Sequence, residues 1–174
     1  WEDHYPVFGR KGTSAVEFTV KSTRPEHRYT LLVQSDDFRV SQSEMQSKRK
    51  YGSYGLKSCW QFNHEPDLAH VFHDHALGIW RLENGKVCGN LTQAANTITQ
   101  RMFFPKCSAE ITVDGSGLKD GDHAGMCALQ EYYAMAAVTK QDRKFYLVMS
   151  GVEDVDGCKK NEITYECIAL DSVV

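Results

Sequence analysis

Aromatic rings, amides and an arginine recur on two short stretches of this chain. The first is Ser58 to Asp67 (SCWQFNHEPD) and the second is Thr97 to Ser108 (TITQRMFFPKCS). Neither stretch places a nucleophile beside a base. Rings that stack on C–H faces, together with side chains that bond to hydroxyl groups, are suited to holding a polyhydroxylated ligand or a partner surface. The two stretches therefore indicate a binding site and not a catalytic one.

The spacing of these residues predicts which of them act together. Trp60 and Phe62 are two apart on an expected strand and so share a face, whereas adjacent strand residues such as Gln100 and Arg101 face opposite ways. One of that adjacent pair is therefore expected to be structural. The alternative for every ring is packing in the core of a β-sandwich. The candidate carbohydrate contacts are Trp60, Phe62, Asn63, His64, Gln100, Arg101, Tyr132 and Tyr133.

Histidines and acids raise the question of a metal site. His64, His70, His73 and His75 are close in sequence, but a zinc site needs three or four ligands in a closed tetrahedron and no fourth ligand is evident. The loop from residue 114 to residue 122 lacks the ligand pattern of an EF-hand. We therefore predict no cofactor, and leave open a structural calcium ion elsewhere.

A catalytic glycosidase needs two carboxylates on either side of the scissile bond. Glu110 and Asp114 lie on one face of an expected strand, but Thr112 occupies the position between them where jelly-roll glucanases place another acid. Catalysis by this pair is the least favoured hypothesis. We expect no catalytic residue within this chain.

Length and charge set further limits. A chain of 174 residues is the size of one domain. Its formal charge of −3 gives no support to nucleic-acid binding, and it has no apolar run long enough to cross a bilayer. The six cysteines form no CxxC pair, and free thiols are favoured over disulfides. The compartment is not readable from the sequence, although we favour an extracellular location over a cytoplasmic one.

The hydrophobic periodicity is that of strands separated by turn dipeptides such as Asn84-Gly85 and Asp114-Gly115. Many short strands predict an all-β fold, a two-sheet antiparallel sandwich of jelly-roll or concanavalin-like type. The expected strands are Ala15–Val20, Leu77–Leu82, Thr97–Phe104, Ser108–Asp114, Ala124–Gln130, Tyr132–Val138, Lys144–Met149 and Ile163–Ala169.

Several strings together resemble the β-sandwich domain that follows the catalytic propeller in family 43 glycoside hydrolases, the β-xylosidases and α-L-arabinofuranosidases. They are SDDF at residues 35–38, WQFNHEPD at 60–67, WRLENGKV at 80–87, LTQ at 91–93, TQR at 99–101 and AGMCALQ at 124–130. Phe62 stands where that family usually has a second tryptophan. The segment WEDHYPVFG at residues 1–9 is similar to the exit from the propeller.

The resemblance implies an arm at residues 1–34 and an accessory β-sandwich domain at residues 35–174, which we expect to be incomplete at its C-terminal end. It implies that the parent protein is a glycoside hydrolase acting on hemicellulose, with the bond-breaking acids outside this chain. The implied partners are a xylan or arabinoxylan chain or oligosaccharide, held by the candidate residues above, and the catalytic propeller of the same protein. The alternative is a purely structural interdomain module with no affinity for sugar.

Overall fold

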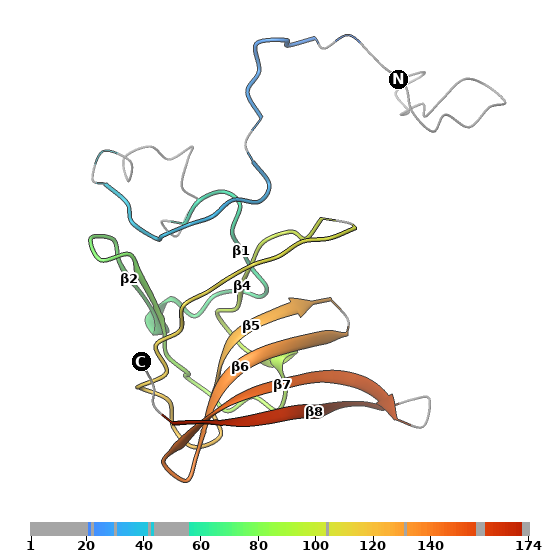
Figure 1. Cartoon of the computed structure of the whole chain (residues 1–174). Coiled ribbons are helices and arrows are strands. Elements are labelled where there is room, and N and C mark those ends of the chain that lie inside the picture. Colours follow the sequence, from blue (N-terminus) through green and yellow to red (C-terminus); the bar gives the residue numbers. More distant parts are fainter. Residues whose placement is uncertain are drawn as a thin grey trace, which may run out of the picture.

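A computed structural model of the chain describes residues 21, 23–29, 31–41, 43, 56–103, 105–130, 132–155 and 159–171. Within these residues the elements are eight β-strands and two single-turn 3-10 helices (Figure 1). Every strand pairing is antiparallel. The prediction of an all-β, antiparallel fold is confirmed. No helix in the described part is long and apolar enough to span a membrane.

The largest sheet is a four-stranded meander in which each strand pairs with the next along the chain. Figure 1 shows the strands side by side in that order, with the smaller sheets drawn on the β5 side. The long run of alternating residues in the second half of the sequence supplies all four strands. Their bounds are β5 His123–Leu129, β6 Tyr133–Gln141, β7 Lys144–Val155 and β8 Lys159–Leu170.

Two smaller sheets carry the aromatic motifs. The first pairs two short strands that are far apart in the sequence, and the second is a hairpin with a full four-residue register. The single-turn helices η1 and η2 are preceded by Asp67 and Asn90, whose side chains accept backbone N–H bonds as N-caps. The bounds are β1 Gln61–Phe62, β2 Val71–Asp74, β3 Ile79–Leu82, β4 Ile98–Thr99, η1 Leu68–His70 and η2 Leu91–Gln93.

One face of the four-stranded sheet forms the main core. Alternate residues of β6 are buried on this face, and β7 adds Val148 and Ser150 beside them. Gly125 of β5 approaches β6 so closely that a Cβ atom would lie 2.2 Å from the carbonyl oxygen of Ala136, so only glycine is accommodated here. The buried residues of β6 are Tyr133, Met135, Ala137 and Thr139.

The opposite face of this sheet is open to solvent although it is apolar. Met149 and Leu147 of β7 are 49% and 43% exposed, and Ile168 of β8 is 50% exposed. These residues alternate with the buried ones, and pair across the strands through Val138↔Leu147 and Leu147↔Ile168. We call Leu147, Met149 and Ile168 the open apolar face.

The structure corrects two strand predictions and leaves one outside its reach. Residues 108–114 alternate like a strand but pair with no described strand, so the segment has no ladder of hydrogen bonds to make it one. The strand expected at Thr97–Phe104 shrinks to β4, because β1 offers only two residues for pairing. The expected strand Ala15–Val20 lies outside the described residues.

Candidate functional site

The WQFNHEPD motif contributes two rings to a packed aromatic cluster of Phe38, Trp60, Phe62, His73 and Trp80. The ring of Phe38 stacks on Trp60 with a centroid separation of 5.6 Å, and on Trp80 with one of 6.0 Å. Phe62 contacts Trp80 at 6.4 Å and His73 meets Trp80 edge-on at 5.1 Å. Trp60 and Phe62 are half-buried here. The structure therefore packs both rings between residues 34–40 and the two small sheets.

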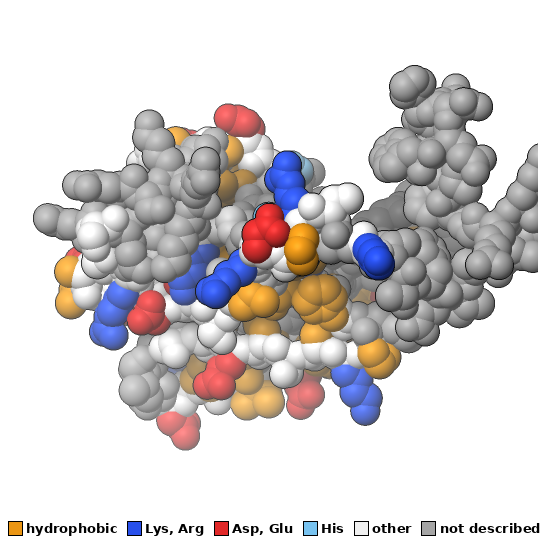
Figure 2. All heavy atoms as spheres, turned by 90° about the horizontal axis from the view of Figure 1, so that it is seen from above, with side chains coloured by type: hydrophobic (Ala, Val, Ile, Leu, Met, Phe, Trp, Pro, Cys, Tyr) orange, Lys and Arg blue, Asp and Glu red, His pale blue; other side chains and the backbone are white. Residues whose placement is uncertain are grey.

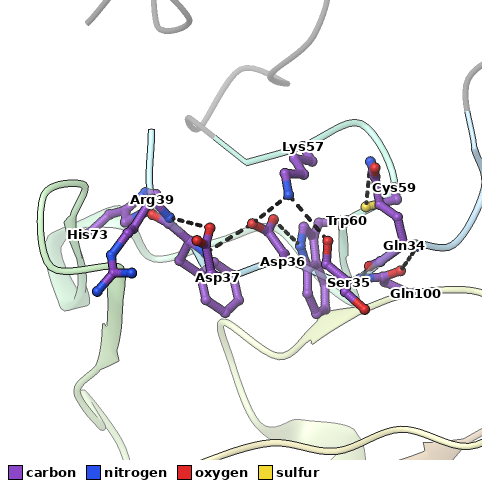
Figure 3. Close-up of polar contacts among 11 residues, drawn as sticks. Gln34, Ser35, Asp36, Asp37, Arg39, Lys57, Cys59, Trp60, His73 and Gln100 are labelled. Carbon is purple, nitrogen blue, oxygen red and sulfur yellow. Dashed lines mark hydrogen bonds and ion pairs between the residues drawn. The ribbon is translucent and has the colours of Figure 1, made fainter. Parts of the chain in front are cut away.

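The strap is the extended segment of residues 34–40, which crosses the aromatic cluster. The carboxylate of Asp36, with its side chain 4% exposed, accepts the Trp60 indole N–H at 2.9 Å and lies 3.0 Å from Lys57 Nζ. It also accepts the backbone N–H of Phe38. A buried carboxylate is costly unless it is paired and hydrogen-bonded, and this one is both. Figure 3 shows Lys57 and the indole on either side of Asp36.

Gln100 fastens the other end of the strap. Its side-chain oxygen accepts the backbone N–H of Gln34, and its amide nitrogen donates to the carbonyl of the same residue, both at 3.0 Å. Figure 3 shows Gln34 and Gln100 next to each other at its right-hand side. Arg101, the next residue, is exposed. Of the adjacent pair, Gln100 therefore holds the fold and Arg101 faces outward.

Asn63 and His64 lie at the end of β1, against η2. His64 Nε2 is 2.6 Å from the carbonyl oxygen of Thr92. A carbonyl only accepts, so Nε2 carries the ring proton. The amide nitrogen of Asn63 is 3.3 Å from the same ring nitrogen, and both residues are exposed. The His64 ring is thus held at η2 by its bond to Thr92, and Asn63 lies beside it at the same accessible edge.

Tyr133 of β6 also contacts η2. It is 4% exposed, its hydroxyl accepts the backbone N–H of Leu91, and it donates to the carboxylate of Glu162 on β8. Burial and the bond to Glu162 raise the pKa of Tyr133 to about 12. Its ring is part of the core. Tyr132, in contrast, is 45% exposed.

The structure thus separates the eight candidate residues into three environments. Trp60, Phe62, Gln100 and Tyr133 are partly or fully buried in packing or polar contacts. Asn63 and His64 lie at η2, the single-turn helix that Tyr133 also contacts. Arg101 and Tyr132 lie on the surface, and a sugar-binding role for any of the eight stays a prediction.

Sequence reasoning overlooked several residues that organise this region. The buried amide of Asn96 accepts the backbone N–H of Asp67 at 2.8 Å and donates to its carbonyl at 3.0 Å, which fixes the loop after WQFNHE. Asn96 has a positive φ of 62°. Asparagine is enriched in that conformation, so the residue type was the only signal available in the sequence.

No group of three His, Cys, Asp or Glu side chains is placed to hold a metal ion in the described part of the chain. His73 and His75 are neighbours, with ring centroids 3.8 Å apart. Glu110 and Asp114 are both exposed on the unpaired segment, and hydrogen bonds from Ser116 lower the pKa of Asp114. Cys59, Cys88, Cys107, Cys127 and Cys167 carry free thiols.

The surface around these groups has mixed charge. Figure 2 shows acidic and basic side chains interspersed around a group of hydrophobic ones on one face. That arrangement is suited to a neutral ligand or a protein partner better than to a polyanion.

Comparison with protein families gives one match. The model of the β-xylosidase C-terminal concanavalin A-like domain, from glycoside hydrolase family 43, matches residues 48–173. The chain belongs to this family. Curated proteins and solved structures give no match. The chain is accordingly a concanavalin-like β-sandwich, an accessory domain of a glycoside hydrolase. The boundary expected between residues 34 and 35 is not tested by this match and stays a prediction.

Proposed function

We propose that this domain binds xylan or arabinoxylan chains and packs against the catalytic propeller of the same protein. The observation that carries the proposal is the match over residues 48–173 to a domain of β-xylosidases. Polar and aromatic side chains that remain accessible support it. These are Asn63, His64, Arg101 and Tyr132.

The chemistry of these four side chains fits a neutral sugar chain. An exposed tyrosine ring can stack on the C–H face of a pyranose, while amide, imidazole and guanidinium groups bond to its hydroxyls. None of the four is needed for the core, so their loss should weaken binding without unfolding the domain. The buried candidates Tyr133 and Gln100 serve the fold in this proposal.

Isothermal titration of the 174-residue chain with xylohexaose and with arabinoxylan tests sugar binding. We expect Tyr132→Ala and Arg101→Ala to weaken association by about tenfold each, as loss of a good contact of roughly 1.4 kcal/mol would. Tyr29→Ala is the matched control, since Tyr29 is 82% exposed and outside the candidate set. Absence of heat from the folded protein with both ligands would remove the sugar-binding proposal.

The open apolar face favours a second candidate, a structural module that serves only as an interface between domains. Exposed apolar surface on a sheet commonly marks a protein contact. On this hypothesis sugar titrations give no heat. The dye 8-anilinonaphthalene-1-sulfonate then binds the isolated chain, and adding the catalytic domain of the parent protein displaces it.

A further inference from the structure

The strap is held over the aromatic cluster by contacts with two histidines near the end of β2. The carbonyl of Phe38 accepts a hydrogen bond from His73 Nε2 at 2.6 Å. The backbone N–H of Val40 donates to the carbonyl of His75 at 3.2 Å. His73 lies at the end of the strap opposite the Gln34–Gln100 pair (Figure 3).

The backbone of the strap does not favour this position by itself. Phe38 has a positive φ of 56°, which a bulky side chain rarely adopts. Such a conformation persists only while surrounding contacts enforce it. The stacking of Phe38 on Trp60 and Trp80, and its bond to His73, are those contacts. Weakening these contacts therefore releases the Phe38 end of the strap, while Asp36 and Gln34 keep their own partners.

The ring of His75 lies where a positive charge is poorly accommodated. Because the Phe38 carbonyl fixes the proton of His73 on Nε2, Nδ1 is left without one. The Nδ1 atoms of His73 and His75 are both buried and have no hydrogen-bond partner among the described residues. With ring centroids 3.8 Å apart, a second proton on the His75 ring would place a charge beside the His73 ring, with no partner for the buried Nδ1 of His75 among the described residues.

Asp74 partly offsets that charge, and the other charged groups around the pair have contacts of their own. On the strap, Asp36 is neutralised by Lys57, and Asp37 accepts the backbone N–H of Arg39. The Arg39 side chain packs near Gly78. On β2, Asp74 accepts the backbone N–H groups of Ala76 and Leu77. On β3, Arg81 pairs with Glu83 and lies over Phe72.

We propose that residues 38–40 of the strap are a pH-sensitive element, closed when His75, whose ring lies against that of His73, is neutral and released when His75 takes up a proton. The closed state holds residues 34–40 against the small sheets. The released state frees residues 38–40, while the bonds of Gln34 to Gln100 and of Asp36 to Trp60 keep the other end in place. This inference does not depend on sugar binding.

The sign of the effect follows from burial. Desolvation, and then the charge of His73, lower the pKa of His75 from its ordinary value of 6.5, while Asp74 opposes them. The released state therefore binds more protons than the closed one. The closed strap has its full stability above pH 6.5 and loses it as the pH falls from there toward the lower pKa of the closed state.

Amide hydrogen exchange on the full chain measures the release directly. Protection factors, taken relative to unfolded peptide at the same pH, are compared at pH 7.5 and pH 5.5. We expect the Val40 amide to lose protection by up to about tenfold for one proton taken up within a pH unit. The amide of Ala137 in the β6 ladder should keep its protection. Equal loss at both sites would mean global unfolding and would overturn the proposal.

Two variants separate the pair from other histidines. His75→Phe keeps a ring and the carbonyl that accepts from Val40, so Val40 protection should no longer depend on pH. His123→Phe is the matched control on β5, where the histidine is exposed, and it should behave as the native chain does. If His75→Phe does not fold, the imidazole resonances of native His75 give the answer. A midpoint at or above 6.5, or Val40 protection unchanged by pH, would refute the proposal.

Discussion

The hydroxyl of Tyr133 is shared by partners from two distant parts of the chain. It accepts from Leu91 at the start of η2 and donates to Glu162 on β8. It therefore joins η2, the 3-10 turn that His64 contacts, to the four-stranded sheet. Tyr132, one residue earlier, is 45% exposed. The different roles of two identical neighbours follow from strand alternation, although the sequence could not tell which of them points inward.

Removing that hydroxyl should destabilise the domain and change its behaviour in alkali. Tyr133→Phe leaves the Leu91 N–H without its partner, which costs about 1–3 kcal/mol of unfolding free energy in urea titrations. In the native chain the pKa of Tyr133 is raised to about 12, above the ordinary value of 10.0.

The alkaline effect has a definite sign. The unfolded chain loses the Tyr133 proton near pH 10 while the folded chain keeps it, so native stability falls between pH 10 and pH 12. In absorbance titration at 295 nm the variant should lack the last tyrosine step. A native chain whose tyrosines all ionise near pH 10 would contradict this.

At the scale of elements, alternation predicted β5 to β8 well and the segments before them poorly. The four expected strands between residues 124 and 169 all exist, because each pairs with a neighbour through a ladder of hydrogen bonds. Residues 108–114 alternate as clearly, yet no described strand pairs with them. The alternation of apolar and polar residues indicates which face of a segment could be buried. A strand also needs a neighbouring strand to pair with, and alternation does not identify that neighbour.

The candidate site was predicted less completely than the sheet. The motifs identified residues that meet in space, such as His64 and Tyr133 at η2. They did not reveal that Gln100 binds Gln34, or that Phe38 stacks between motifs, because both depend on contacts far apart in sequence. Residue type alone cannot separate a ring in a small core from one in a binding cleft.

The turn between β6 and β7 offers a stabilising change. Asp142 and Arg143 have φ values of 49° and 63°, between the paired residues Gln141 and Lys144. Two-residue hairpin loops of this kind favour glycine at the second position. Arg143→Gly should raise the free energy of unfolding by roughly 0.5–1 kcal/mol, measured by thermal denaturation. Arg143→Val, with a β-branched side chain at positive φ, should lower it.

At the scale of the whole molecule, the sheet is asymmetric. One face of β6 and β7 is buried against the rest of the domain, while Leu147, Met149 and Ile168 face solvent. Apolar groups left in water favour association with any complementary surface. When no partner is bound, copies of the chain should therefore associate with one another through this face.

Substitutions of two adjacent residues on β7 test whether the two faces of the sheet differ. Met149→Lys should leave the free energy of unfolding within about 0.5 kcal/mol, since Met149 is half exposed, and should reduce self-association in sedimentation velocity. Val148→Lys is its counterpart on the buried face. Val148 is 5% exposed, so a charge there should cost several kcal/mol and prevent folding. Equal tolerance of both changes would show that the faces are not distinct.

The meander order of β5 to β8 also bears on how the chain reaches its native state. Each of its three pairings joins consecutive strands, so the sheet can assemble by successive short loop closures. The contacts between Gln34 and Gln100 instead span 66 positions. Because distant pairings pay a larger entropic cost before they gain any contact, the meander should form first and the strap should settle last. A destabilising change in the strap should then accelerate unfolding far more than it slows folding.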